Sequence, residues 1–171
     1  MSRHRTPIVL LVLLVLAALP IVGAGWQRLA TDRDHRRFPP PGELITVDGH
    51  HGARLHLQTQ GRHHRQDNPQ TPVVLLDAGT PGFSAQWGWI APAIAQFATV
   101  VAYDRPGLGW SDSRSENAPF DPRDTADRLH TALQKIGLPG PYLLVGHSYG
   151  GLTIRVFAAA YPDVISGIVL V

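Results

Sequence analysis

The stretch that decides the fold is YLLVGHSYGG, residues 142–151. Its first four residues form an unbroken apolar run, as in strands covered on both faces. Residues 146–150 then read Gly-x-Ser-x-Gly, the pattern of a sharp strand-to-helix turn that lifts a serine hydroxyl clear of a sheet edge. Glycines are needed on both sides of Ser148, because a Cβ there would collide with the neighbouring strand and helix. The pattern predicts a nucleophilic Ser148, although a glycine-rich turn with an incidental serine would read the same way.

Similar apolar runs occur at residues 73–76, 100–103 and 168–171. Helical patterns lie between the runs, at residues 86–97, 122–137 and 149–160, with Asp121 or Asp124 as the cap of the second. Two alternating segments, residues 43–48 and 53–59, come first and predict a hairpin, and the polar residues 61–71 predict an exposed loop. This order of elements predicts a single α/β domain with a mostly parallel sheet.

A second glycine-rich segment, DAGTPGFS at residues 77–84, directly follows the run at 73–76. Acyl transfer needs two donors for its oxyanion, and a turn after this strand can present one backbone N–H to the pocket. The amides of Thr80 and Tyr149 are the natural pair. A glycine and proline turn without a catalytic role is the alternative.

The loop YDRPGLGWSD, residues 103–112, follows the run at 100–103. Its proline and two glycines favour a rigid turn. We therefore interpret it as scaffold, in which Asp104 and Arg105 form structural hydrogen bonds within the loop.

These three motifs, in this order, resemble the α/β-hydrolase superfamily, and the resemblance covers about residues 43–171. The Pro-Pro-Gly linker before the first hairpin is especially similar to that of membrane-anchored or exported bacterial members. The resemblance implies an α/β-hydrolase fold truncated after about the sixth strand, a nucleophile at Ser148, and oxyanion donors at the amides of Thr80 and Tyr149. Ala78-Gly79 stands where the family usually has His-Gly, a departure in side chain only. The turn at residues 146–150 corresponds to the nucleophile elbow of this family, and serine rather than aspartate at the elbow favours ester, lactone, thioester or amide substrates over those of epoxide hydrolases and haloalkane dehalogenases.

A serine hydroxyl is a poor nucleophile without a base, and the base is missing from the expected place. In the family order the acid and the histidine follow the serine, yet downstream of Ser148 the only acid is Asp163 and there is no histidine. Asp163 lies about 15–20 Å away along the helix, too far to serve. His147 adjoins Ser148, but we expect its side chain to point to the opposite side. We expect the triad acid and histidine beyond residue 171, since an apolar last strand also favours an incomplete sequence.

The remaining histidines give no clear site. His50, His51, His56, His63 and His64 gather around the hairpin and are interpreted as polar loop and strand-face residues, with a metal site as the weaker alternative. His130 is expected on a helix surface. The chain has no cysteine, which excludes a disulfide scaffold, a thiol nucleophile and a cysteine-ligated zinc site. No metal or organic cofactor is predicted.

The N-terminal residues 1–27 are predicted to be a signal anchor or a cleaved signal peptide. Ile8 to Trp26 is nineteen residues long, just enough to span a bilayer, while Val22-Gly23-Ala24 would suit a cleavage site. Residues 28–42, ending in Pro-Pro-Pro-Gly, are expected to form a linker. The expected location is the cell membrane with the domain outside the cytoplasm, or a secreted or periplasmic protein after cleavage.

Charge argues against a nucleic-acid partner. The net charge is +4 over residues 1–37 and −2 over residues 38–171, so the domain itself is not basic.

From the motifs and the N-terminal segment we predict a membrane-tethered serine hydrolase of small acyl substrates. The alternative is a non-catalytic tethered module of the same fold. A nucleotide-binding protein is disfavoured, since no phosphate-binding glycine motif follows the first buried strand. The sequence does not indicate an oligomeric state.

Overall fold

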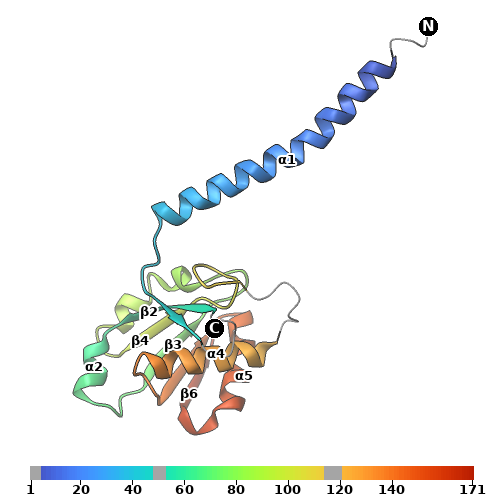
Figure 1. Ribbon diagram of the computed structural model, residues 1–171. Coiled ribbons are helices and arrows are strands. Elements are labelled where there is room, and N and C mark those ends of the chain that lie inside the picture. Colours follow the sequence, from blue (N-terminus) through green and yellow to red (C-terminus); the bar gives the residue numbers. More distant parts are fainter. Residues whose placement is uncertain (1–4, 48–52, 114–120) are drawn as a thin grey trace. The chain divides into compact units, whose positions relative to one another are not determined.

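The computed structural model describes residues 5–47, 53–113 and 121–171, with side chains described from residue 13 onward. The chain divides into two compact units, Met1–Pro39 and Pro40–Val171. Figure 1 shows the elements of both units in sequence colours.

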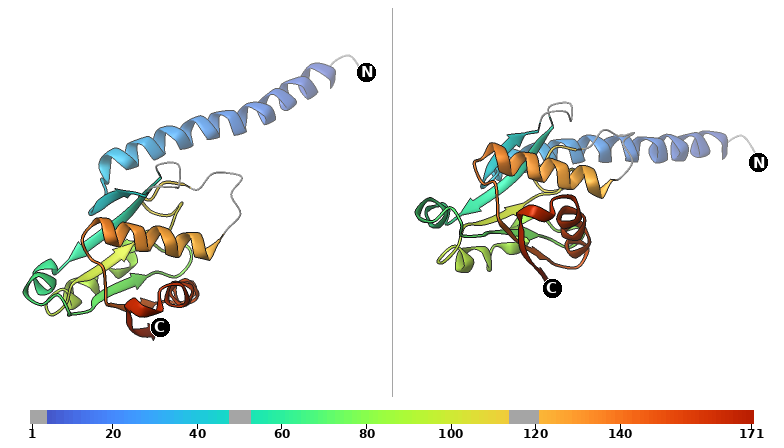
Figure 2. Two further views of the ribbon diagram at one scale, coloured as in Figure 1. Left: turned by 60° about the horizontal axis from the view of Figure 1, so that its bottom comes forward. Right: turned by 90° about the horizontal axis from the view of Figure 1, so that it is seen from below.

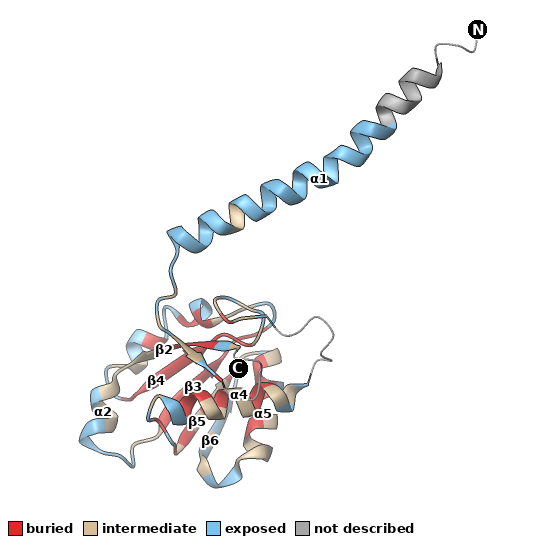
Figure 3. Ribbon diagram, viewed as in Figure 1, coloured by how far each residue is buried: buried red, intermediate tan, exposed pale blue. Residues whose placement is uncertain are grey.

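The first unit is one long helix, α1, from Arg5 to Arg37. Its large apolar side chains from Leu13 to Leu29 are exposed, so no protein core covers them (Figure 3). Among the described residues α1 is the one helix long and apolar enough to cross a membrane, judged by length and composition.

The expected linker at residues 28–42 is helical as far as Arg37, which corrects that expectation. Residues 28–37 contain arginine, leucine and alanine, which favour helices, and lack glycine and proline. The helix ends before Pro39, because the residue that precedes a proline is pushed out of the helical region.

The second unit is built on a six-stranded sheet. Its strands are β1 (Glu43–Thr46), β2 (Arg54–Gln60), β3 (Val73–Asp77), β4 (Val100–Tyr103), β5 (Tyr142–Gly146) and β6 (Ile165–Leu170). Their order in the sheet is β1-β2-β4-β3-β5-β6. The pairs β1–β2 and β2–β4 are antiparallel, and the pairs β4–β3, β3–β5 and β5–β6 are parallel. The predicted hairpin and mostly parallel sheet are confirmed.

The central strands bury both faces, as their unbroken apolar runs predicted. Successive residues alternate between two clusters: Val73 and Leu75 face one, and Val74 and Leu76 face the other. The first cluster lies under α4 (Pro122–Lys135) and α5 (Tyr149–Ala160), which pack against each other (Figure 2). The second lies under η1 (Ser84–Trp87) and α3 (Ala91–Ile94).

Two of the expected elements differ in the structure. The helix expected at residues 86–97 is split into η1 and the four-residue α3, because Gly88 interrupts it and Pro92 restarts it. The expected loop at residues 61–71 contains α2 (Arg62–Asp67), which buries no residue and therefore lacks the apolar periodicity that reveals a helix.

The ends of α4 follow the predicted signals. The Asp121 carboxylate accepts a 2.8 Å hydrogen bond from the Arg123 backbone N–H, so Asp121 rather than Asp124 is the cap. Gly137, with φ 75°, ends the helix. α4 therefore covers the sheet between these two residues and fixes the position of α5 beside it.

Candidate active site

The parallel strands bring their carboxyl ends, and the loops that follow, to one edge of the sheet. β3 and β5 are neighbours, and their last residues, Asp77 and Gly146, are register partners. The two glycine-rich segments singled out in the sequence begin at these residues. Crevices outside the carboxyl ends of such strands are where α/β sheets bind ligands.

Ser148 has an unusual backbone conformation, with φ 52° and ψ −118°. Within the described ranges it is the only residue other than glycine with a positive φ. Backbone N–H groups close the turn around it: Gly150 donates to the His147 carbonyl at 2.8 Å and Gly151 to the Ser148 carbonyl at 2.9 Å. Such strain persists only where the surroundings enforce it, and it leaves Ser148 exposed at the start of α5.

Packing explains the glycines on both sides of the serine. A Cβ on Gly146 would lie 2.7 Å from the Cα of Gly151, and a Cβ on Gly150 would lie 2.7 Å from the carbonyl carbon of Asp77. Both distances are too short for a real Cβ, and both neighbours are backbone atoms. The strand, the turn and the start of α5 therefore approach more closely than any side chain at these positions would allow.

The segment after β3 lies against the elbow. A Cβ placed on buried Gly79 would be 3.2 Å from the Ser148 Cβ and 2.8 Å from the His147 Nδ1. Thr80 follows and is exposed, as Ser148 is. Within the part of the chain that the structure describes, the Thr80 N–H donates no hydrogen bond. The structure thus brings together the three predicted site residues, because Tyr149 is the first residue of α5.

A buried polar network lies beneath this edge of the sheet, and it was not predicted from the sequence. At its centre is Asp77, the last residue of β3, which is 1% exposed. Its carboxylate accepts a 2.6 Å hydrogen bond from the Tyr103 hydroxyl and further bonds from Thr153 and Arg105. The network therefore joins the ends of β3 and β4 to α5. A lone acid directly after a fully apolar run was the available signal.

Arg105 connects this network to the turn after β3. Its guanidinium donates to the carbonyls of Ala78 and Gly79, and it lies 5.3 Å from the centre of the Tyr149 ring. The expectation that Arg105 bonds within its own loop is corrected, since these partners lie on other segments. Five N–H donors in a fixed plane let one arginine hold several carbonyls at once.

Burial dominates the electrostatics of the network. It raises the pKa of Asp77 above its usual range, although the positive charge of Arg105 and the hydrogen bonds from Thr153 and Tyr103 act in the opposite direction. Burial also raises the pKa of Tyr103 well above its ordinary value, and the neighbouring charge of Asp77 adds to the effect. Tyr103 therefore stays protonated in the folded protein at pH values where an exposed tyrosine ionises.

Replacing Tyr103 by phenylalanine should change how stability depends on alkaline pH. Above about pH 10 the unfolded chain loses the Tyr103 proton that the folded chain keeps, so the free energy of unfolding falls as pH rises. Because Tyr103→Phe removes this contribution, the free energy of unfolding of the variant should fall less steeply with rising pH. At neutral pH the loss of the hydrogen bond to Asp77 should lower its stability by about 1 kcal/mol. Urea unfolding at neutral and alkaline pH measures both effects. Parallel declines in the two proteins would contradict the assignment.

Asp104 and His56 form a second buried pair beside the site, and both are fully buried. The Nδ1 of His56 lies 2.9 Å from Asp104 Oδ2, while the backbone N–H groups of Ser84 and Trp110 donate to the same carboxylate. Burial works to raise the pKa of Asp104, but these hydrogen bonds outweigh it and lower that pKa. His56 lies on a strand face, as expected, but that face is buried: the Trp110 ring lies 5.1 Å from the His56 ring. Of these three partners of Asp104, only Trp110 lies within its own loop, so the expectation of bonds within the loop holds for Trp110 and is corrected for Ser84 and His56.

The other histidines lie as follows. The His147 ring lies against Gly79, with its Nδ1 3.4 Å from Gln86 Nε2, and no hydrogen bond joins it to Ser148 in the described ranges. His130 is half-buried and stacks on Tyr161 at 3.9 Å. His63 and His64 lie on α2, and His50 and His51 fall outside the described residues. Among described residues, no three metal-binding side chains gather in one place.

Comparison with known proteins places the chain in a family. A family model described as the alpha/beta hydrolase fold matches residues 46–171. The chain therefore belongs to the α/β-hydrolase family, and the fold expected from the three motifs is confirmed.

Individual relatives agree with this placement. A thermophilic esterase from Thermogutta terrifontis is 26% identical, with a TM-score of 0.63 over 75% of this chain and 44% of the esterase. The epoxide hydrolase CorEH is 25% identical, with a TM-score of 0.61 over 75% of this chain and 40% of that enzyme. An uncharacterized vacuolar membrane protein of Saccharomyces cerevisiae is 35% identical over 109 residues, which are 61% of this chain and 17% of that protein. The chain thus spans less than half the length of each.

Proposed function

We propose that the chain is the nucleophile-bearing part of a serine hydrolase that cleaves carboxylic esters or related acyl compounds. The observation that carries this proposal is the strained, exposed Ser148 with the Gly79–Thr80 turn packed against it. Strain at a single exposed serine has a structural cost, and such costs are characteristic of reactive sites.

The proposed chemistry is acyl transfer. The Ser148 hydroxyl oxygen bonds to the acyl carbonyl carbon and passes its proton to a histidine. The carbonyl oxygen becomes an oxyanion, which the backbone N–H groups of Thr80 and Tyr149 stabilise. The intermediate then expels the alcohol, which takes the proton from the histidine, and water releases the acyl group from Ser148 in the same two stages.

The histidine and its acidic partner are proposed to come from a segment beyond residue 171. Asp163 follows the far end of α5, the helix that Ser148 begins, and His147 is not hydrogen-bonded to Ser148 in the described structure. The chain spans 44% of the matched esterase, which leaves room for such a segment in a longer protein. No metal or organic cofactor is needed for this chemistry.

The substrate class follows from the nucleophile. A serine forms an acyl ester that water can hydrolyse, which fits ester, lactone, thioester or amide substrates. The esterase among the structural neighbours supports this choice. The likeness to CorEH supports the fold, but we do not propose an epoxide substrate, because the residue between the elbow glycines is serine.

We propose that α1 anchors the protein in a membrane with the domain outside the cytoplasm. The length and exposed apolar surface of α1 support the anchor, as does the relative named as a vacuolar membrane protein. Cleavage after residues 22–24 would instead release the domain, and N-terminal sequencing of the mature protein distinguishes these outcomes.

Ester hydrolysis by the product of the whole reading frame tests the proposal. We expect turnover of p-nitrophenyl esters and its loss, by at least about 1000-fold, in Ser148→Ala. Ser166→Ala is the matched control, because Ser166 lies in β6 and its hydroxyl donates to the carbonyl of Tyr142 at the start of β5, the end of that strand farther from Ser148. A folded protein that hydrolyses no ester, thioester or amide, with or without Ser148, would favour the non-catalytic tethered module.

A further inference from the structure

The last three turns of α1 carry a concentration of charge that the proposed chemistry does not use. Between Trp26 and Arg37 there are four arginines and two aspartates, all exposed. Neither Arg33 nor Arg36 forms an ion pair with Asp32 or Asp34 within the described residues. These arginines are therefore available to an outside partner.

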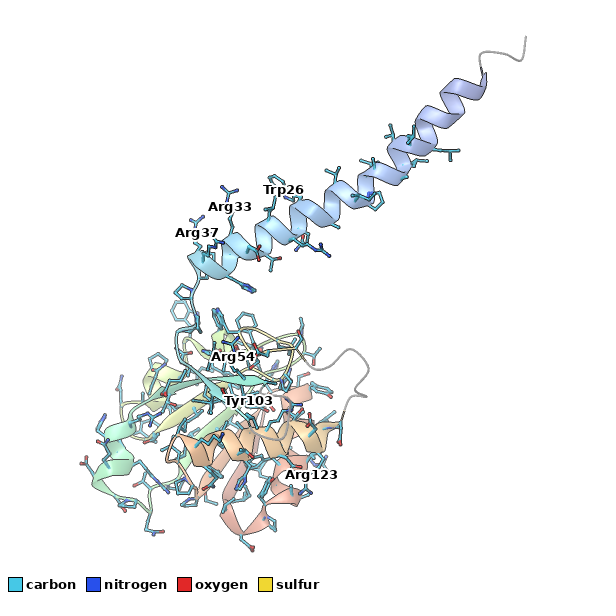
Figure 4. All side chains as sticks on the ribbon, in the orientation of Figure 1. Trp26, Arg33, Arg37, Arg54, Tyr103 and Arg123 are labelled. Atoms are coloured by element: carbon cyan, nitrogen blue, oxygen red, sulfur yellow. The ribbon has the colours of Figure 1, made fainter. Side chains whose placement is uncertain are left out.

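Five exposed residues of this segment fall on one face of the helix: Trp26, Leu29, Arg33, Arg36 and Arg37. Their spacings of three, four and seven residues are those of a single stripe at 3.6 residues per turn. Figure 4 shows the side chains of Trp26, Arg33 and Arg37 projecting from the same side of α1. We call these five residues the arginine stripe. Asp32 and Asp34 border it on either side, and the spacing places Arg28 on the opposite face.

The stripe begins where the apolar segment ends. Trp26 is the last residue of the apolar segment, it is 70% exposed, and tryptophan prefers the interface between lipid tails and headgroups. At 1.5 Å per residue Arg33 lies about 10 Å beyond Trp26, and Arg37 about 16 Å. Headgroups extend about 5–8 Å from the hydrocarbon, so an upright helix would bring Arg33 but not Arg37 within reach. A tilt of α1 within the membrane would bring Arg36 and Arg37 closer to the surface.

We propose that the arginine stripe binds the phosphates of anionic phospholipids in the membrane that α1 enters. Arginine matches phosphate oxygens with two parallel N–H donors, and the aromatic and leucine side chains enter the boundary with the tails. The Arg37 guanidinium also lies 5.6 Å over the ring of Phe38, which extends the amphipathic surface. This proposal rests on the proposed membrane anchor and adds a lipid preference to it.

Flotation of the full chain with vesicles tests the two proposals separately. Vesicles of phosphatidylcholine alone measure the anchor, and vesicles that also contain phosphatidylglycerol measure the stripe. We expect the chain to bind both kinds of vesicle and to partition more strongly into the anionic ones. Added salt should weaken this preference for anionic vesicles. Arg33→Gln should lower the partition into anionic vesicles about fivefold and leave the partition into phosphatidylcholine unchanged.

Arg155→Gln is the matched control, because it removes the same charge from an exposed residue of α5, outside α1, and we expect a clearly smaller loss. Equal losses from Arg155→Gln and Arg33→Gln would overturn the stripe, since net charge alone would then explain the preference. Equal partition of the unsubstituted chain into both vesicles would also overturn it and leave the anchor standing. Failure to float with either vesicle would overturn the anchor itself.

Discussion

Gly150→Ala should destabilise the domain by about 3 kcal/mol or more, whereas Gly151→Ala, one residue later, should be nearly neutral. The new Cβ at position 150 would lie 2.7 Å from the Asp77 carbonyl carbon and 2.8 Å from the Ala78 carbonyl oxygen. Both are backbone atoms at the end of the central β3, so relief requires a shift of the strand or of α5. Because Ser148 directly precedes that helix, the same shift would also displace the turn at residues 146–150.

The neighbouring substitution supplies the control. A Cβ on Gly151 would meet Leu170 Cδ2 at 3.2 Å, and the Leu170 side chain is 61% exposed and free to move aside. Alanine also favours helix over glycine. Urea unfolding of the two variants measures the difference, and similar stabilities would contradict the close approach of α5 to β3.

Arg105→Met should cost about 3–5 kcal/mol, because it leaves the Asp77 carboxylate buried without its cation. Arg105 is 6% exposed and Asp77 is 1% exposed, so water cannot compensate for the lost charge. The carbonyls of Ala78 and Gly79 lose their donor in the same step. We expect unfolding at a lower urea concentration together with a looser turn at Thr80.

The pH dependence of this loss has a definite sign. Burial raises the pKa of Asp77, and loss of the guanidinium removes an interaction that lowers it. A group with a raised folded pKa contributes stability below its unfolded pKa and loses that contribution as pH rises. The deficit of Arg105→Met should therefore be smaller at about pH 5 than at about pH 7.5. A deficit independent of pH would contradict the burial of a charged Asp77.

Arg54→Met is the matched control for the loss of an arginine from an ion pair. Arg54 and Asp112 form a bidentate pair at the surface, with side chains 49% and 34% exposed. Exposed pairs contribute little because water and salt screen them. The free energy of unfolding of Arg54→Met should be much closer to that of the unsubstituted protein. A loss of stability as large as that of Arg105→Met would show that burial is not the cause of the Arg105→Met effect.

The parts of the fold that the sequence predicted are those decided by local patterns. Three apolar runs predicted the buried central strands β3, β4 and β5, whereas the fourth, residues 168–171, lies in the exposed edge strand β6. The glycines around Ser148 predicted the turn into α5, because periodicity and sterics act over a few residues. The turn at residues 79–80 was predicted beside Ser148 from the family resemblance and from the position of its strand. The continuation of α1 beyond residue 27 was not predicted, because residues 28–37 are highly charged and lead into a run of prolines.

The buried network could not be predicted, because its members are far apart in the sequence. Asp77, Arg105 and Thr153 meet only after β3 takes its place between β4 and β5, an order that differs from the chain order. His56 and Asp104 likewise approach across the antiparallel pair of β2 and β4. A polar residue in an apolar strand shows that a partner is needed, but it does not say which one.

The proposed function depends above all on Ser148 being a nucleophile. The most direct measurement is to treat the folded product of the whole reading frame with a fluorophosphonate, digest it, and locate the adduct by mass spectrometry. We expect one dominant adduct at Ser148, absent from Ser148→Ala and retained in Ser166→Ala. Folded protein without an adduct at Ser148, or with adducts spread over exposed serines, would contradict it.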